Sequence, residues 1–291
     1  MIVKHFFDPD TYTLTYLAID EISKDTVIID PVLDFDPPSG VVTDTSATEL
    51  INFIQKEKLN IRAILETHAH ADHLSSSQLL KQHFPNAVIG IGEKIKVVQE
   101  FFKTHFNIDY LKLGGEQFDY LFKDFEEVQF GSLKMKAIPT PGHTPACMSY
   151  LFGNHLFTGD ALFMPDYGTG RCDFPKGSSK DLYQAVTKNL YTLPDSTLVY
   201  VGHDYLPNGR ELKFQTTIGE SKRSNIQLKS STTEQDYVSF RDARDRTLKA
   251  PRLLLPSIQV NIDAGHLPPV ENNGKSYLKL PLNPKIKNGQ I

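Results

Sequence analysis

The segment Thr67-His-Ala-His-Ala-Asp-His73 concentrates side chains that bind metal ions. His68, His70, Asp72 and His73 fall within six residues, and imidazole and carboxylate groups are common ligands of zinc, iron and manganese. The alternative is a polar loop in which the histidines occur by chance, but this spacing is rare in a chain of 291 residues. We therefore predict a buried metal site centred on this segment.

Three later segments share one arrangement: an apolar run predicted to be a strand, then a glycine, then a metal-binding side chain. The side chains are His143, Asp160 and His203. Loops that follow neighbouring strands converge on one edge of a sheet, where α/β proteins place their chemistry. A single Gly-His pair is commonly only a turn, so the prediction rests on the shared context. It extends the metal site to seven residues.

Strand and helix patterns interleave around these loops. Runs rich in β-branched and aromatic residues predict strands at 2–7, 14–19, 26–29, 61–65, 87–91, 146–152, 155–158 and 197–201. A hairpin is predicted over 125–138 with its turn at Gly131-Ser132, and a second turn at Gly153-Asn154. Helical spacing appears at 74–83, 94–102, 178–190 and 234–248, and the capping box Ser46-Ala-Thr-Glu49 predicts another helix start. The interleaving indicates two sheets faced by helices.

The amino-acid composition changes after Ala250, where prolines become frequent. We predict a catalytic domain over 1–249 and an extension over 250–291 that packs on the domain or on a partner subunit. Apolar side chains at 253–255 and Ile258 could pack across a two-fold interface in a homo-oligomer, and the sequence leaves the oligomeric state open. Deletion beyond Ala250 is predicted to expose apolar surface and lower solubility.

Composition and charge favour an ordinary globular protein, with 40% apolar residues, 23% charged residues and a net charge of −4. The charge balance and the lack of a basic patch argue against nucleic acid as a partner. No apolar run is long enough to span a bilayer, and the N-terminal residues do not resemble a signal peptide. Two cysteines are too few for a disulfide framework. We expect a cytoplasmic protein without a membrane partner.

With these motifs in place, the chain from about Leu14 to Tyr205 resembles the metallo-β-lactamase superfamily. The resemblance implies a four-layer αββα sandwich with the metal at one edge, an α/β fold. It also implies two metal positions, bridged by Asp160. Their ligands would be His68, His70 and His143 at one, and Asp72, His73 and His203 at the other.

A finer resemblance is to the persulfide dioxygenases and their bacterial β-lactamase-hydrolase-like relatives. It is carried by the segments 66–73, 159–174, 202–205 and 250–256. By this resemblance the chain would bind one Fe(II) through His68, His143 and Asp160, the two-histidine, one-carboxylate composition of non-haem iron oxygenases. Four residues would then support the ligands or hold a second metal: His70, Asp72, His73 and His203.

The substrates implied are glutathione persulfide, or a similar thiol persulfide, and O2, with sulfite and the thiol as products. Arg171 and Tyr205 match residues that contact glutathione in the resembling enzymes, and Arg223 is a looser match. A guanidinium suits this role because its planar fork binds both oxygens of a carboxylate. Cys172, beside Arg171, is given no role, since free cysteines are usually small buried hydrophobes.

The leading alternative is a dinuclear zinc hydrolase of thioesters, similar to glyoxalase II (hydroxyacylglutathione hydrolase). All seven ligands for two zinc ions are present, and a bridging hydroxide would be the nucleophile. Glyoxalase II normally adds a helical glutathione-binding domain, which the Pro-rich extension does not resemble. A non-catalytic protein on the same scaffold is less favoured because such proteins usually lose ligands.

Overall fold

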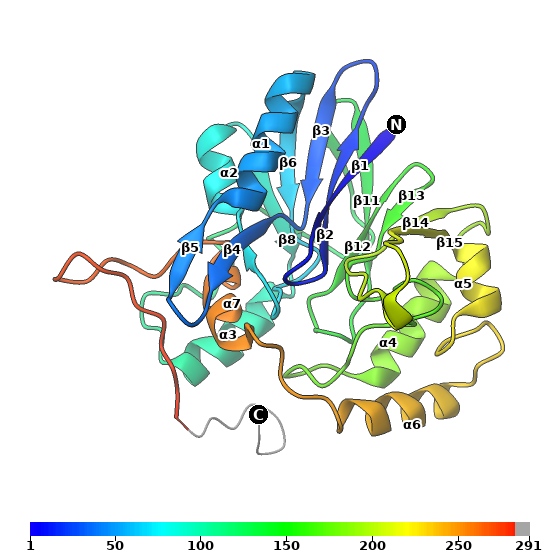
Figure 1. Cartoon of the computed structure of the whole chain (residues 1–291). Coiled ribbons are helices and arrows are strands. Elements are labelled where there is room, and N and C mark those ends of the chain that lie inside the picture. Colours follow the sequence, from blue (N-terminus) through cyan, green and yellow to red (C-terminus); the bar gives the residue numbers. More distant parts are fainter. Residues whose placement is uncertain (283–291) are drawn as a thin grey trace.

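The first sheet is formed by the N-terminal part of the chain in this computed structural model, which describes residues 1–282 (Figure 1). Its strands, in spatial order, are β1 (Ile2–Asp8), β2 (Thr13–Ile19), β3 (Asp25–Ile29), β6 (Asn60–Leu65), β8 (Val88–Gly92) and β9 (Tyr120–Phe122). β1, β2 and β3 are antiparallel, and β3, β6, β8 and β9 run parallel. Successive strand residues point to opposite faces, so Leu14 and Tyr16 enter one core and Leu17 enters the other.

The second sheet is formed by later segments of the chain. Its strands, in spatial order, are β10 (Glu127–Phe130), β11 (Leu133–Pro139), β12 (Met148–Phe152), β13 (His155–Phe157), β14 (Leu198–Tyr200) and β15 (Gln215–Thr217). Only the pair β13 and β14 is parallel. The predicted turns at Gly131 and Gly153 are confirmed, and both glycines have positive φ angles of 60° and 57°.

Helices cover the outer side of each sheet (Figure 1). On the first sheet lie α1 (Thr45–Glu57), α2 (Ser77–His83), α3 (Ile95–Phe106) and α7 (Leu254–Asn261). On the side of the second sheet lie α4 (Ser179–Ala185), continued by a π-helical turn (Val186–Leu190), α5 (Ile218–Ser224) and α6 (Glu234–Asp245). A small sheet of β5 (Val41–Thr43), β4 (Val32–Asp36) and β7 (Leu74–Ser75) flanks the first. The expected αββα sandwich is confirmed.

Three elements differ from the predictions. Ser46 does not cap α1, because its hydroxyl donates to Asp34 Oδ1 at 2.7 Å and the helix begins one residue earlier. The predicted helix over 74–83 begins only at Ser77, since residues 74–75 pair with β4. Helix α7 was not predicted, yet Ile258 is fully buried in the same core as α1 and α3.

The predicted extension over 250–291 is described only as far as residue 282. Within residues 1–282, none of the helices is both long enough and apolar enough to cross a membrane.

Candidate metal centre

Four loops, each following a strand, bring the predicted ligands together at one edge of the sandwich. The loop after β6 in the first sheet carries the His68–His73 segment, and β11, β13 and β14 in the second sheet lead to His143, Asp160 and His203. The two sheets are tied at this edge, where the Leu14 amide donates to the Gly202 carbonyl at 2.9 Å. The shared strand-then-ligand context therefore identified loops that do converge in space.

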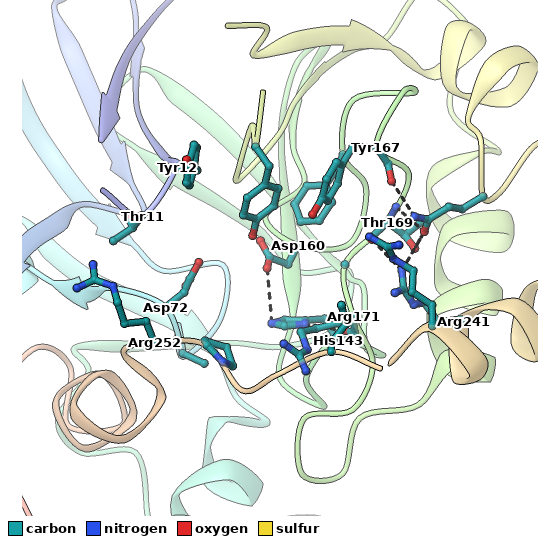
Figure 2. A pocket seen from close by; sticks show the side chains of 18 of the residues that line it. Thr11, Tyr12, Asp72, His143, Asp160, Tyr167, Thr169, Arg171, Arg241 and Arg252 are labelled. Carbon is teal, nitrogen blue, oxygen red and sulfur yellow. Dashed lines mark hydrogen bonds and ion pairs between the residues drawn. The ribbon is translucent and has the colours of Figure 1, made fainter. Parts of the chain in front are cut away.

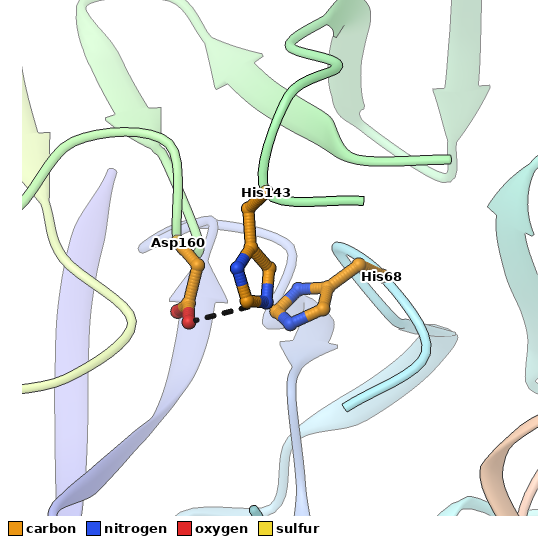
Figure 3. A group of neighbouring side chains, drawn as sticks. All are labelled: His68, His143 and Asp160. Carbon is orange, nitrogen blue, oxygen red and sulfur yellow. Dashed lines mark ion pairs between the residues drawn. The ribbon is translucent and has the colours of Figure 1, made fainter. Parts of the chain in front are cut away.

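One compact group contains His68, His143 and Asp160 (Figure 3). One ligand atom from each residue lies within 4.8 Å of the others, and His143 Nε2 is 3.6 Å from Asp160 Oδ2. All three side chains are buried. Two imidazoles and one carboxylate on one side of a metal leave other coordination positions open for small molecules.

A second group lies alongside and contains His70, Asp72 and His203. His203 Nε2 is 3.1 Å from Asp72 Oδ2 and 3.3 Å from Asp160 Oδ1, so His203 connects the two groups. The resemblance had assigned His70 to the other metal position and His73 to this one. His73 instead packs against His70, with ring centroids 4.2 Å apart, and belongs to neither group by the same 4.8 Å criterion.

Hydrogen bonds set which ring nitrogen of the first-group histidines carries the proton. His143 Nδ1 is 2.6 Å from the Arg171 carbonyl, which only accepts, so Nδ1 is protonated and Nε2 keeps its lone pair. The Thr67 hydroxyl donates to Asp30 Oδ2 at 2.8 Å and can therefore accept from His68 Nδ1 at 3.0 Å. Both Nε2 atoms are left as metal ligands.

The next two histidines of the motif are also oriented by hydrogen bonds, although His70 uses its other ring nitrogen. His70 Nε2 lies 3.0 Å from Asp30 Oδ1 and 3.3 Å from Glu66 Oε2, so this nitrogen carries the proton and Nδ1 faces the site. His73 Nδ1 lies 3.1 Å from the Leu74 carbonyl, which leaves the Nε2 lone pair free. Asp30, Glu66 and His70 form a third compact group, whose contacts are explained by this shared imidazole proton.

Burial is the largest influence on the charge of these imidazoles. Burial, with a smaller effect of the neighbouring His70, lowers the pKa of His68 well below its ordinary value and that of His73 to about 3. Burial also opposes a charge on His70, but Asp30 and Glu66 outweigh it and raise the pKa of His70 well above its ordinary value. The motif thus combines neutral imidazoles with one supported by two carboxylates.

The donor set fits a metal. Among the described residues, five buried ligand atoms have no hydrogen-bond partner: His68 Nε2, His70 Nδ1, His73 Nε2, Asp160 Oδ1 and His203 Nε2. Buried polar atoms are rarely left unsatisfied in folded proteins, so their gathering at one place fits a cation that they would bind together. Their chemistry, imidazole nitrogen and carboxylate oxygen, suits iron, zinc or manganese.

Glycines allow the ligand loops to approach one another closely. Gly159 has a φ of 49°, and a β-carbon there would overlap the Thr67 side chain. A β-carbon on Gly170 would overlap the Asp160 carbonyl. The Gly-Asp and Gly-Thr-Gly stretches of the sequence are therefore required by backbone packing around Asp160.

A cavity of about 300 Å³ opens onto the metal centre (Figure 2). His143, Asp160 and Asp72 line it, and tyrosine and arginine side chains form much of the remaining lining. Such a cavity has the size expected for a small-molecule site.

The structure brings two of the three predicted substrate residues to this cavity. Arg171 lines the wall, where it donates to both Asp173 oxygens at 2.6 Å and to the Lys249 carbonyl at 2.8 Å. Tyr205 also lines the cavity and stacks on Tyr167 with ring centroids 4.7 Å apart.

Arg223 does not line this cavity. It lies exposed on α5, paired with Glu220 at 3.0 Å. The structure therefore does not bring Arg223 to the cavity, and its substrate contact stays a prediction. The reason is that its short helix is held on the outer side of the second sheet, away from the strand ends.

Sequence reasoning missed several residues that surround the site. Asp30 follows β3 directly and accepts from the Thr67 amide at 2.7 Å, so the strand-then-carboxylate signal could have identified it. Arg244 and Arg252 line the cavity, and neither pairs with a carboxylate among residues 1–282. Nothing local in the sequence distinguishes them from solvated surface arginines.

Comparisons with known proteins agree with this geometry. Residues 9–203 match the family model described as the metallo-beta-lactamase superfamily, and the chain belongs to that superfamily. Glyoxylase B2 of Dictyostelium discoideum is 48% identical over 283 residues, covering 97% of each chain. The human mitochondrial persulfide dioxygenase ETHE1 is 32% identical over 207 residues, covering 70% of this chain and 69% of that protein.

A solved structure extends the comparison to three dimensions. The crystal structure of ETHE1 from Myxococcus xanthus aligns with a TM-score of 0.73 and 30% identity, and the alignment covers 91% of this chain and all of that chain. The resemblance to the superfamily and to its persulfide dioxygenases is confirmed. A metal-dependent enzyme is the class of protein that this fold and site define.

Proposed function

We propose that the chain is a persulfide dioxygenase that uses one Fe(II). The observation that carries this proposal is the compact group of His68, His143 and Asp160, in which both imidazoles direct Nε2 lone pairs inward. Two histidines and a carboxylate are the ligand set of non-haem iron oxygenases. When bound, Fe(II) would bring together the terminal persulfide sulfur and O2 and transfer electrons between them.

The expected reaction balances as persulfide (RSSH), O2 and water giving thiol (RSH), sulfite and two protons. The S–S bond breaks, the terminal sulfur is oxidised, and both atoms of O2 are reduced onto it. The protein binds and positions the persulfide and keeps the ligand side chains oriented. Asp72, 23% exposed and 3.1 Å from His203 Nε2, is the partly accessible carboxylate beside the cavity and helps to orient His203.

The walls of the cavity support a thiol that carries carboxylates, such as glutathione. Arg244 and Arg252 have no carboxylate partner among residues 1–282, and guanidinium groups bind carboxylates through paired hydrogen bonds. Arg171 is ion-paired with Asp173, so it shapes the wall of the cavity and offers to a substrate only the N–H groups that are not used in this pair. A cytoplasmic location and a homo-oligomeric state remain part of the proposal.

A dinuclear zinc thioester hydrolase is the second candidate. The group of His70, Asp72 and His203 favours it, because it supplies ligands for a second ion beside the first. The similarity to a protein named Glyoxylase B2 also favours it.

Metal analysis and two assays separate the candidates. The protein is purified without oxygen, loaded with iron or zinc, and tested for O2 uptake with glutathione persulfide and for hydrolysis of S-lactoylglutathione. About one iron per chain with O2 uptake supports the dioxygenase. Absence of O2 uptake by a fully iron-loaded sample refutes it, and two zinc ions with thioester hydrolysis establish the hydrolase.

A pair of matched variants sharpens the comparison. Asp160→Asn removes a carboxylate of the first group and Asp72→Asn one of the second, with the same change in size and charge. For a single-iron dioxygenase, Asp160→Asn abolishes iron binding, whereas Asp72→Asn retains about one iron per chain. For a dinuclear hydrolase, each variant loses at least one metal ion.

A further inference from the structure

We propose that Asn261, at the C-terminal end of α7, is a positioning residue for the metal centre. It fixes the backbone of the loop 68–73 and its continuation through hydrogen bonds to main-chain groups. The inference requires a metal at this loop, but it does not depend on which reaction the enzyme catalyses.

One side chain makes three hydrogen bonds to this loop and its continuation. Asn261 Nδ2 donates to the His70 carbonyl at 2.8 Å and to the His73 carbonyl at 2.7 Å, and its Oδ1 accepts from the Ser75 amide at 2.8 Å. Asn261 is 4% exposed, so water does not substitute readily for these bonds. A carboxamide is the smallest side chain with two donors and an acceptor, and all three functions are used.

The bonds constrain the two histidines whose carbonyls they hold. The side chains of His70 and His73 leave the same residues toward the site, where His70 Nδ1 and His73 Nε2 have no other partner among the described residues. The third bond adds a second route to His70. The Ser75 hydroxyl donates to Glu66, and Glu66 Oε2 is 3.3 Å from His70 Nε2.

Asn261 is itself held firmly, which a positioning residue requires. Gln99 on α3 donates to the Ile262 carbonyl at 2.8 Å, and Gln78 on α2 donates to the Ala264 carbonyl at 3.0 Å. Ile258 and Ile262 are fully buried in the core beneath these helices. The C-terminal segment is thus anchored to the helical layer, and Asn261 anchors the metal loop to this segment.

The test measures Co(II) binding to the full chain by competition with a chelator, together with the visible absorption of the bound Co(II). Asn261→Ala is expected to weaken Co(II) affinity about 10-fold to 100-fold, the range for losing a partner that supports metal ligands. The absorption bands should also shift because the imidazole geometry is relaxed. Wild-type affinity with a wild-type spectrum would overturn the proposal.

Gln99→Ala is the matched control, because it removes a buried amide that binds the same C-terminal segment without touching the metal loop. It is expected to lower the melting temperature while leaving Co(II) affinity and spectrum unchanged. Equal loss of affinity in Gln99→Ala and Asn261→Ala would overturn the proposal, since the effect would then be general destabilisation.

Asn261→Asp keeps the proposal testable if the alanine variant does not fold. It preserves size and the acceptor for Ser75 but replaces the two donors by an oxygen that faces the His70 and His73 carbonyls. It should bind Co(II) more weakly than wild type, and unchanged affinity would refute the inference. A protein without dioxygenase activity that still shows these affinity losses would refute the proposed function and leave the role of Asn261 intact.

Discussion

Replacing Arg241 by methionine should destabilise the wall of the cavity and disturb the hydrogen bond that orients His143. Arg241 is 2% exposed and donates to Asp245 Oδ1 at 2.6 and 3.0 Å, and to Gln227 at 2.9 Å. Asp245 in turn accepts from the Cys172 amide at 2.7 Å, next to the Arg171 carbonyl that orients His143. The change leaves a buried carboxylate without its counter-charge.

Removing one partner of a buried ion pair costs about 3–5 kcal/mol. At about 2.1 cal/mol/K per residue, a chain of 291 residues has an unfolding entropy of about 0.6 kcal/mol/K. The melting temperature should therefore fall by about 5–8 °C, measured by calorimetry or circular dichroism. Arg244→Met, on the same helix but exposed, is the control and should change stability by less than about 0.5 kcal/mol.

A double variant tests the stated cause. In Arg241→Met/Asp245→Asn the buried charge is gone, while the asparagine oxygen can still accept from the Cys172 amide. The double variant should be more stable than Arg241→Met alone. If it is less stable than the single variant, or if Arg241→Met melts together with Arg244→Met, the uncompensated charge is not the cause and the reasoning is refuted.

Three further predictions concern charge and metal. Asp30→Asn should weaken metal affinity about 10-fold to 100-fold, because Asp30 accepts from the Thr67 hydroxyl, which in turn accepts from Nδ1 of the ligand His68, and an unchanged affinity in a chelator competition would contradict this. Burial raises the pKa of Asp263 from 3.8 to about 6, so this carboxyl makes folding less favourable as pH rises from about 4 to about 6. Asp263→Asn should therefore have a higher melting temperature than wild type at pH 7.5 but not at pH 4. Equal differences in melting temperature at both pH values would count against this prediction. Metal at 100 times its Kd stabilises the folded state by about 2.7 kcal/mol, so chelation should lower the melting temperature by about 4–5 °C, and a metal-free sample with an unshifted midpoint would disprove the link.

The convergence of the candidate ligand side chains could be predicted because its signal is local. A side chain directly after a strand is placed at the sheet edge by the strand itself, so His143, Asp160 and His203 needed only their own flanking residues. The two glycine turns of the hairpins are local signals of the same kind. The αββα layers followed from the alternation of apolar patterns and from the resemblance.

The supports of the site could not be predicted, because each depends on residues distant in sequence. Asn261 donates to the carbonyls of His73 and His70, which lie 188 and 191 positions earlier in the sequence. Helix α7 was hidden by Pro256, which lies in the first turn, where a proline costs no helical hydrogen bond. Arg223 looked like Arg244 in sequence, and only the packing of α5 and α6 decides which of them faces the cavity.

The two ligand groups differ in the hydrogen bonds and charges around their histidines. His68 and His143 bond through Nδ1 to neutral oxygens and offer Nε2 lone pairs. His203 differs, because burial opposes a charge on it but Asp72 and Asp160 raise its pKa, and its Nε2 lies 3.1 and 3.3 Å from their oxygens. A second ion would require this Nε2 as a lone-pair ligand, at a place where the two carboxylates also favour a proton on it. Protonation of His203 therefore competes with binding of a second ion, whereas hydrogen bonds at Nδ1 orient the Nε2 atoms of His68 and His143 for a first ion.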